Sequence, residues 1–205
     1  MANSDKKPWE EDVRLGQQPL SVVGRLLLSI RRDVSARQQR EQGDSKWGLG
    51  CCTHERYKYQ VTQLAGTPGY EWLSVVHVGQ EFAFAINGCP MRQFKGDSEE
   101  PPTRQLERAR EQLSLFPTLA VEDPTWLWFL VVETDIHGLG IRVVVEQANA
   151  DGDTRYRWVA ARASDLTGDF GSMPPVAPAP IHPMTDSPPP IVEPLTNTEI
   201  EEELK

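Results

Sequence analysis

Cysteine is scarce in this sequence, and neither a secretory nor a membrane-spanning segment can be recognised in it. Only three cysteines occur among 205 residues, an odd number that does not suit a disulfide scaffold. No apolar run approaches the roughly 20 residues that a transmembrane helix needs. The polar start of the chain lacks the apolar stretch of a signal peptide. We therefore expect a cytoplasmic protein with free thiols.

Familiar catalytic and cofactor motifs are also missing. The chain has no G-x-x-x-x-G-K-[ST] loop and no glycine-rich dinucleotide fingerprint after a strand, and it lacks G-x-S-x-G and H-E-x-x-H. A zinc set can be imagined from Cys51, Cys52, His54 and Cys89. Adjacent cysteines, however, do not have the C-x2-C spacing that brings two thiolates to one tetrahedral ion. We expect no metal and no cofactor, and the balance leans against an enzyme.

Basic residues are outnumbered, which gives a formal net charge of -9. This acidic balance argues against a dedicated nucleic-acid binder, although a local basic face can coexist with it.

Proline is concentrated at the end of the chain: from Gly171 onward, nine of 35 residues are proline. Because proline removes a backbone donor and fixes φ, we predict that 171–205 is a disordered, acidic tail. Residues 1–18 are predicted to be a flexible N-terminus, and 19–170 a single domain.

An amphipathic helix is predicted at 19–42. Its apolar positions recur every three or four residues and form one stripe: Leu20, Val23, Leu27, Ile30 and Val34. Gly24 weakens such a helix by up to about 1 kcal/mol, which suggests close packing at that point. The stripe must be buried, either on the domain's own sheet or on a second chain. That second chain is an identical subunit or a larger assembly to which this protein is an accessory.

A mostly antiparallel sheet is predicted for the rest of the domain. Strands are expected at 55–64, 71–78, 81–86, 91–95, 126–133, 141–147 and 156–161, and a second helix at 103–116. Most connections between strands have hairpin length, which favours antiparallel pairing. The fold class is therefore α+β, with about six or seven strands and two helices. The run 126–133 is apolar at every position except its last, which predicts a central strand buried on both faces.

Basic residues next to an aromatic side chain form the first candidate site. Arg92 and Lys95 flank Phe94, and Arg104 and Arg108 begin the second predicted helix. Arginine and lysine beside an aromatic ring can clamp phosphates and stack bases. The acidic residues at 97–100 can also neutralise these cations, which would leave ordinary surface ion pairs.

Carboxylates at strand ends form the second candidate site. Glu133 and Asp135 follow the apolar strand, Glu146 ends the next one, and His137 lies between them. Such groups can act as acid and base or hold a divalent ion. Solvated turn residues are the simpler interpretation.

Three functions remain open on the sequence alone. The first is a non-catalytic interaction or accessory protein that binds another protein, or itself, through the helix at 19–42 or the tail. The second is a nucleic-acid-associated module that uses the basic groups at 92–110. The third is a hydrolase with the carboxylate site at 133–146. No membrane partner is expected.

Overall fold

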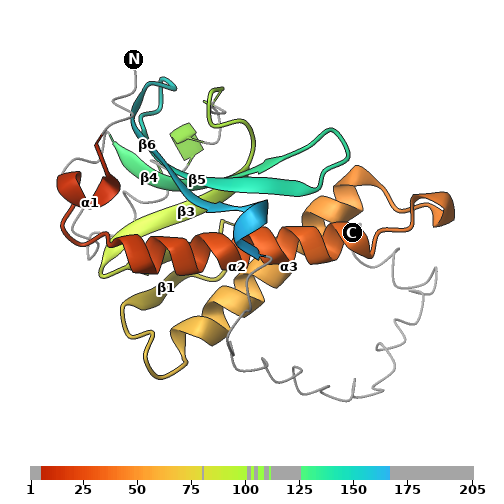
Figure 1. The fold of residues 1–205 in the computed structure, drawn as a ribbon, viewed down its shortest axis with the longest axis horizontal. Helices are drawn as coiled ribbons and strands as arrows, with labels where there is room; N and C mark the ends of the chain where they lie inside the picture. Colours follow the sequence, from red (N-terminus) through yellow and green to blue (C-terminus); the bar gives the residue numbers. More distant parts are fainter. Residues whose placement is uncertain are drawn as a thin grey trace, which may run out of the picture.

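The protein is an α+β fold built on one six-stranded sheet (Figure 1). The structure, a computed structural model, describes residues 6–79, 81–100, 103, 106–108, 111 and 126–166. The strands follow one another in the sheet in chain order: β1 Leu73–His77, β2 Ala83–Ile86, β3 Cys89–Lys95, β4 Leu127–Thr134, β5 Gly140–Ala148 and β6 Thr154–Arg162. The predicted fold class and mostly antiparallel sheet are confirmed.

Two antiparallel meanders meet in the middle of this sheet. β1, β2 and β3 form the first meander, β4, β5 and β6 form the second, and β3 pairs with β4 in parallel. Asn87 and Gly88 connect β2 to β3, and both have positive φ (48° and 78°), as a two-residue type I′ hairpin requires. The parallel pair is possible because a long segment separates β3 from β4.

The sheet carries its long helices on one face. α2 spans Gln17–Ala36 and α3 spans Lys46–Ala65, and Figure 1 shows both running along the same side of the strands. Three short elements complete the set: α1 Pro8–Glu11, η1 Arg40–Gln42 and η2 Ala163–Leu166. Among the described residues, no helix combines the length and the hydrophobicity needed to cross a bilayer.

The predicted strand at 55–64 is wrong, because this segment belongs to helix α3. Its alternation of aromatic and charged residues resembles a strand, but the buried positions have helical spacing: Leu49, Thr53, Tyr57, Val61 and Leu64. Ser45 begins the helix, since its hydroxyl accepts a hydrogen bond from the Gly48 amide at 3.0 Å.

Helix α2 is shorter at its C-terminal end than the predicted 19–42. It ends at Ala36, and a separate 3-10 turn at Arg40–Gln42 precedes Gly43, whose φ of 100° turns the chain toward α3. The predicted stripe is buried in the core of the same chain: Leu20, Val23, Leu27, Ile30 and Val34. These side chains pack on their own domain, so they offer no accessible surface to a partner in this structure.

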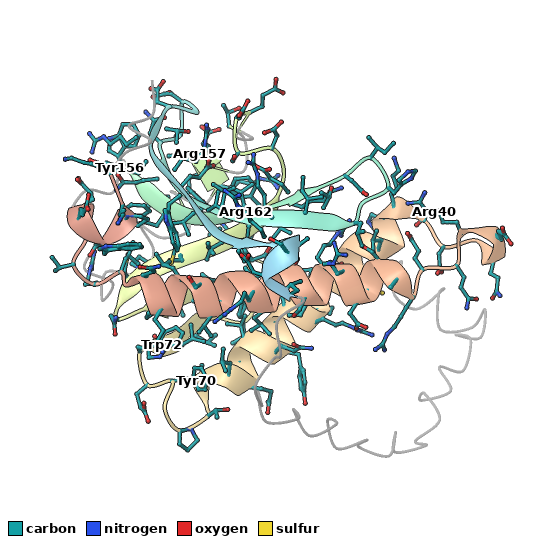
Figure 2. The ribbon with its side chains drawn as sticks, in the orientation of Figure 1. Arg40, Tyr70, Trp72, Tyr156, Arg157 and Arg162 are labelled. Carbon is teal, nitrogen blue, oxygen red and sulfur yellow. The ribbon has the colours of Figure 1, made fainter. Side chains whose placement is uncertain are left out.

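The N-terminal segment also packs on the domain, although the sequence suggests a flexible 1–18. Trp9 meets Trp158 edge to face, with ring centroids 5.1 Å apart. Tyr156 is labelled on β6 in Figure 2. Its hydroxyl donates a 2.6 Å hydrogen bond to Glu11, and Leu15 is 1% exposed. The predicted tail at 171–205 lies outside the described residues.

Strand β4 separates two apolar clusters, as the run at 126–133 predicts. Trp128, Leu130 and Val132 belong to the cluster under the helices. Leu127, Phe129 and Val131 belong to a second cluster on the opposite face. Of the predicted helix at 103–116, only 103, 106–108 and 111 are described; these are helical, and Leu106 joins the second cluster.

Gly24 lies at a close approach between α2 and the sheet. A Cβ added there would lie 2.8 Å from the Ala160 Cβ, nearer than packed carbon atoms normally come. At Gly50 of α3 an added Cβ would meet nothing within 4 Å. The close packing inferred from the sequence is therefore present at Gly24.

We expect Gly24→Ala to lower the free energy of unfolding by about 1–2 kcal/mol, because the added methyl group overpacks the helix–sheet contact. The matched variant Gly50→Ala should raise it by about 0.5–1 kcal/mol through helix propensity alone. Urea unfolding monitored by circular dichroism measures both. Equal stabilisation by the two substitutions would contradict the close approach.

Candidate anion-binding pocket

A pocket opens where β3 extends beyond its neighbour β2. The pairing of β2 with β3 ends at Met91, whereas β4 pairs with β3 as far as Lys95. Among the described residues, no strand pairs with the outer edge of 92–95. A cavity of about 370 Å³ lies at this edge, lined by residues of α2, α3, β3 and β4 together with Glu81 and Arg108.

Positive charge dominates the lining of this pocket. Its cationic side chains come from separate parts of the chain: Arg31, Arg92, Lys95 and Arg108. His54 also lines it, and Glu81 is its single carboxylate among the described residues. Glu81 pairs with one terminal nitrogen of Arg92, while the other, Nη1, is buried with no hydrogen-bond partner among the described residues. The pocket therefore holds more positive charge than its own carboxylate can balance.

Arg31 is the most deeply buried of these cations. It is 3% exposed, and its Nε donates to the Gly138 carbonyl at 2.8 Å and its Nη1 to the Thr53 hydroxyl at 3.3 Å. Both acceptors are neutral, and the described residues provide no carboxylate within ion-pair distance of Arg31. Burial lowers the pKa of Arg31. A buried charge without a counter-ion is costly, so an anion arriving in the pocket would stabilise this arrangement.

Lys95 lies at the open side of the pocket. Its exposed side chain makes no ion pair with the described residues. Its pKa is lowered by partial burial first, and then by the positive charges of Arg31 and Lys46. Arg31 of α2 and Lys46 of α3 both repel the charged form of Lys95, and an anion bound beside Lys95 would offset that repulsion.

Three of the four basic residues singled out in the sequence meet in this pocket. Arg92, Lys95 and Arg108 line it together, and Arg104 lies outside the described residues. Sequence reasoning missed Arg31 and His54. Arg31 lies in the predicted helix at 19–42 but outside its apolar stripe, and the misassigned strand at 55–64 hid the packing of α3 beside α2.

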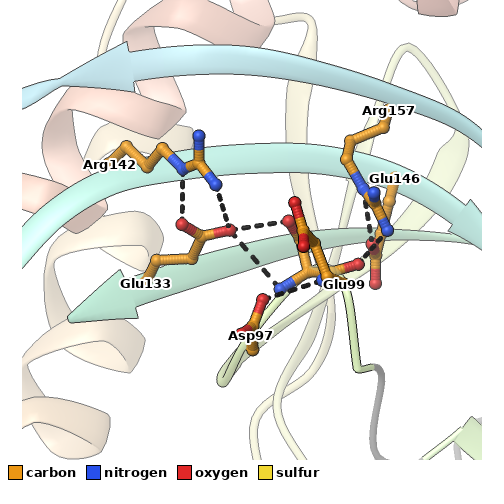
Figure 3. A network of polar contacts seen from close by, with 7 residues as sticks. Asp97, Glu99, Glu133, Arg142, Glu146 and Arg157 are labelled. Carbon is orange, nitrogen blue, oxygen red and sulfur yellow. Dashed lines mark hydrogen bonds and ion pairs between the residues drawn. The ribbon is translucent and has the colours of Figure 1, made fainter. Parts of the chain in front are cut away.

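The predicted carboxylate site does not assemble. Asp135 accepts hydrogen bonds from the His137 and Leu139 amides and so closes the β4–β5 turn, where His137 is exposed. Glu133 and Glu146 instead share the face of the sheet turned away from α2 and α3 (Figure 3). The four residues therefore occupy two places rather than one pocket.

Arginines neutralise much of the Glu133–Glu146 face. Glu133 pairs with Arg142 and accepts a 2.6 Å hydrogen bond from the Ser98 hydroxyl. Glu146 is fully buried and lies 3.9 Å from Nε of Arg157, but neither of its oxygens accepts a hydrogen bond from the described residues. Burial raises the pKa of Glu146 to about 7; Arg157 opposes this shift, and Glu133 and Asp97 add to it. Glu146 is thus a buried acid in an ionic network rather than part of an open site.

The cysteines do not converge either. Cys51 and Cys52 are exposed on α3, and Cys89 is buried in the core, where burial raises the pKa of its thiol. Within the described ranges, no group of three or more His, Cys, Asp or Glu residues is placed to hold a metal ion.

Comparisons with family models, with curated proteins and with solved structures find no match to this chain. The pocket at the edge of β3 is therefore interpreted from its own geometry.

Proposed function

We propose that this protein is a non-catalytic binding module that takes up a phosphate-bearing ligand in the pocket at the edge of β3. The observation that carries the proposal is the buried Arg31, which has no carboxylate partner among the described residues. Arg92, Lys95 and Arg108 line the same pocket. Guanidinium and ammonium groups bind phosphate oxygens through charge-assisted hydrogen bonds.

This proposal develops the nucleic-acid hypothesis drawn from the basic groups at 92–110. It also keeps the non-catalytic character of the accessory-protein hypothesis. The apolar stripe of the helix is buried in the core. The proposed binding surface is therefore the pocket rather than that helix. A role for the tail as a docking peptide stays a prediction. The hydrolase hypothesis loses support, because Asp135 and His137 lie in a turn away from Glu146.

Retention on phosphocellulose tests the proposal. We expect the full chain to elute from this resin at higher salt than from carboxymethyl-cellulose, because the pocket recognises phosphate rather than any anion. The double variant Lys95→Gln/Arg108→Gln removes two exposed cations of the pocket and should lose this difference. Both side chains are exposed, so the fold should be preserved.

The double variant Lys6→Gln/Arg25→Gln serves as a matched control, since it also removes one lysine and one arginine, both exposed and outside the pocket lining. It should elute with the wild type on both resins. If the Lys95→Gln/Arg108→Gln variant and this control shifted equally, retention would reflect net charge alone, and the proposal would be contradicted.

A further inference from the structure

One large apolar side chain stands in water beside the pocket. Trp47, in the first turn of α3, is 80% exposed. An indole left uncovered forgoes much of the stabilisation that burial of its area would give. Its position relative to the cations shows what it can contact.

Helical geometry places Trp47 on the pocket side of α3. Gly50, His54 and Tyr57 line the pocket, and Trp47 precedes Gly50 by three residues and His54 by seven. Residues with these spacings share one helix face, and one turn advances about 5.4 Å along the axis. Trp47 therefore lies about one turn beyond the pocket lining.

Lys46 supports this placement independently. Its positive charge contributes to the lowered pKa of Lys95 in the pocket, as expected when the start of α3 lies near Lys95. The exposed indole and the group of positive charges are thus neighbours on one surface.

We propose that this surface binds single-stranded nucleic acid, with backbone phosphates held by the pocket cations Arg92, Lys95 and Arg108 and a neighbouring base stacked on Trp47. This inference rests on the proposed function and names its ligand. Proteins that bind single strands combine a cationic groove with aromatic side chains on which bases stack. A duplex keeps its bases stacked inside, so it cannot present a base face to Trp47. A free phosphate or a phosphopeptide would leave the indole without a nucleobase to stack on.

The test compares two fluorescein-labelled strands of about ten nucleotides on the full chain by fluorescence anisotropy. One strand is oligothymidylate, and the other has the same phosphates with abasic tetrahydrofuran residues. We expect the wild type to bind the base-bearing strand about 5- to 150-fold more tightly, the range that stacking of one base provides. Trp47→Ala should remove this preference and leave affinity for the abasic strand unchanged, whereas Trp47→Phe should keep most of the preference.

Tyr59→Ala is the matched control, because Tyr59 is a partly exposed aromatic residue of α3 (36% exposed) that does not line the pocket. It should bind both strands as the wild type does. Equal binding of the two strands by the wild type would overturn the base-stacking inference and leave the phosphate pocket intact. A Trp47→Ala variant that still preferred the base-bearing strand would also overturn the base-stacking inference.

Further binding experiments distinguish single-strand recognition from duplex or membrane binding and test the phosphate pocket itself. A blunt duplex of the same length that bound as tightly as the single strand, or anionic phosphatidylserine vesicles that displaced the strand, would overturn single-strand recognition. If Lys95→Gln/Arg108→Gln bound the abasic strand as well as the wild type, the proposed phosphate pocket itself would fail.

Discussion

Leu130→Asp is expected to unfold the domain. Leu130 is 0% exposed in the middle of β4, within the cluster that α2 and α3 cover. The substitution removes buried apolar contacts and places a carboxylate among apolar side chains, at a cost on the order of 5 kcal/mol or more. Domains of this size are stable by only about 5–15 kcal/mol. The variant domain should therefore be largely unfolded and show no cooperative thermal transition. Differential scanning calorimetry measures this loss.

Ile141→Asp is the control for a charge placed in the sheet. Ile141 lies on β5, adjacent to β4, and is 42% exposed. The new carboxylate therefore stays in water, and the melting temperature should fall only slightly. A folded Leu130→Asp variant with an unchanged transition would show that β4 is not the centre of the core.

Stability should also depend on pH through Glu146. The pKa of Glu146 in the folded protein is raised from 4.5 to about 7. The folded state therefore holds a proton that the unfolded state releases between these values. The stabilisation is fully present below pH 4.5 and is lost as pH rises through about 7. By linkage, the loss amounts to about 3 kcal/mol.

Glu146→Gln keeps the shape of the side chain and cannot ionise. Relative to the wild type, the variant should therefore gain free energy of unfolding as the pH rises from 4.5 to 8. Urea unfolding across this range measures it, and taking the difference cancels the titration of other groups. Glu41→Gln, which removes an exposed carboxylate in η1, should show no such trend. A parallel pH dependence in the wild type and Glu146→Gln would contradict the raised pKa.

The sequence predicts β4 well because a buried strand leaves a direct signal. Every position from Leu127 to Val132 is apolar, and both faces of the strand must then be covered. The pattern at Leu20 to Val34 predicts α2 for a similar reason, since one apolar stripe fits only a helical period. Both signals are local, so neither depends on how distant segments meet.

Helix α3 shows where such reasoning fails. Tyr57, Tyr59 and Val61 alternate with polar or charged residues and resemble a strand. Tyr59 is nevertheless partly exposed, and only Tyr57 and Val61 of the three are buried. Tertiary packing against α2 and β1 selects the helix over this local pattern. The parallel pairing of β3 with β4 has no local signal either, because it depends on the path of the chain between them.

The candidate pocket was half predictable from the sequence. Arg92 and Lys95 both belong to β3, so the sequence alone places them on one strand, although their odd spacing directs them to opposite faces of it. Arg31 joins them only because α2 crosses the sheet and its guanidinium reaches the β4–β5 turn at Gly138. Trp47 lies near the pocket for a similar reason, because α3 packs beside α2 and carries Gly50 and His54 into the pocket lining.

A titration followed by two-dimensional amide NMR tests the phosphate pocket most directly. Inorganic pyrophosphate is added to the full chain, with sulfate at equal ionic strength as the reference. The account predicts that the largest pyrophosphate-specific shifts fall on the amides of 92–95 and on Arg31 and His54, and that Lys95→Gln/Arg108→Gln abolishes them. Pyrophosphate shifts that match those of sulfate, or that centre on other arginines such as Arg40 or Arg155, would contradict it.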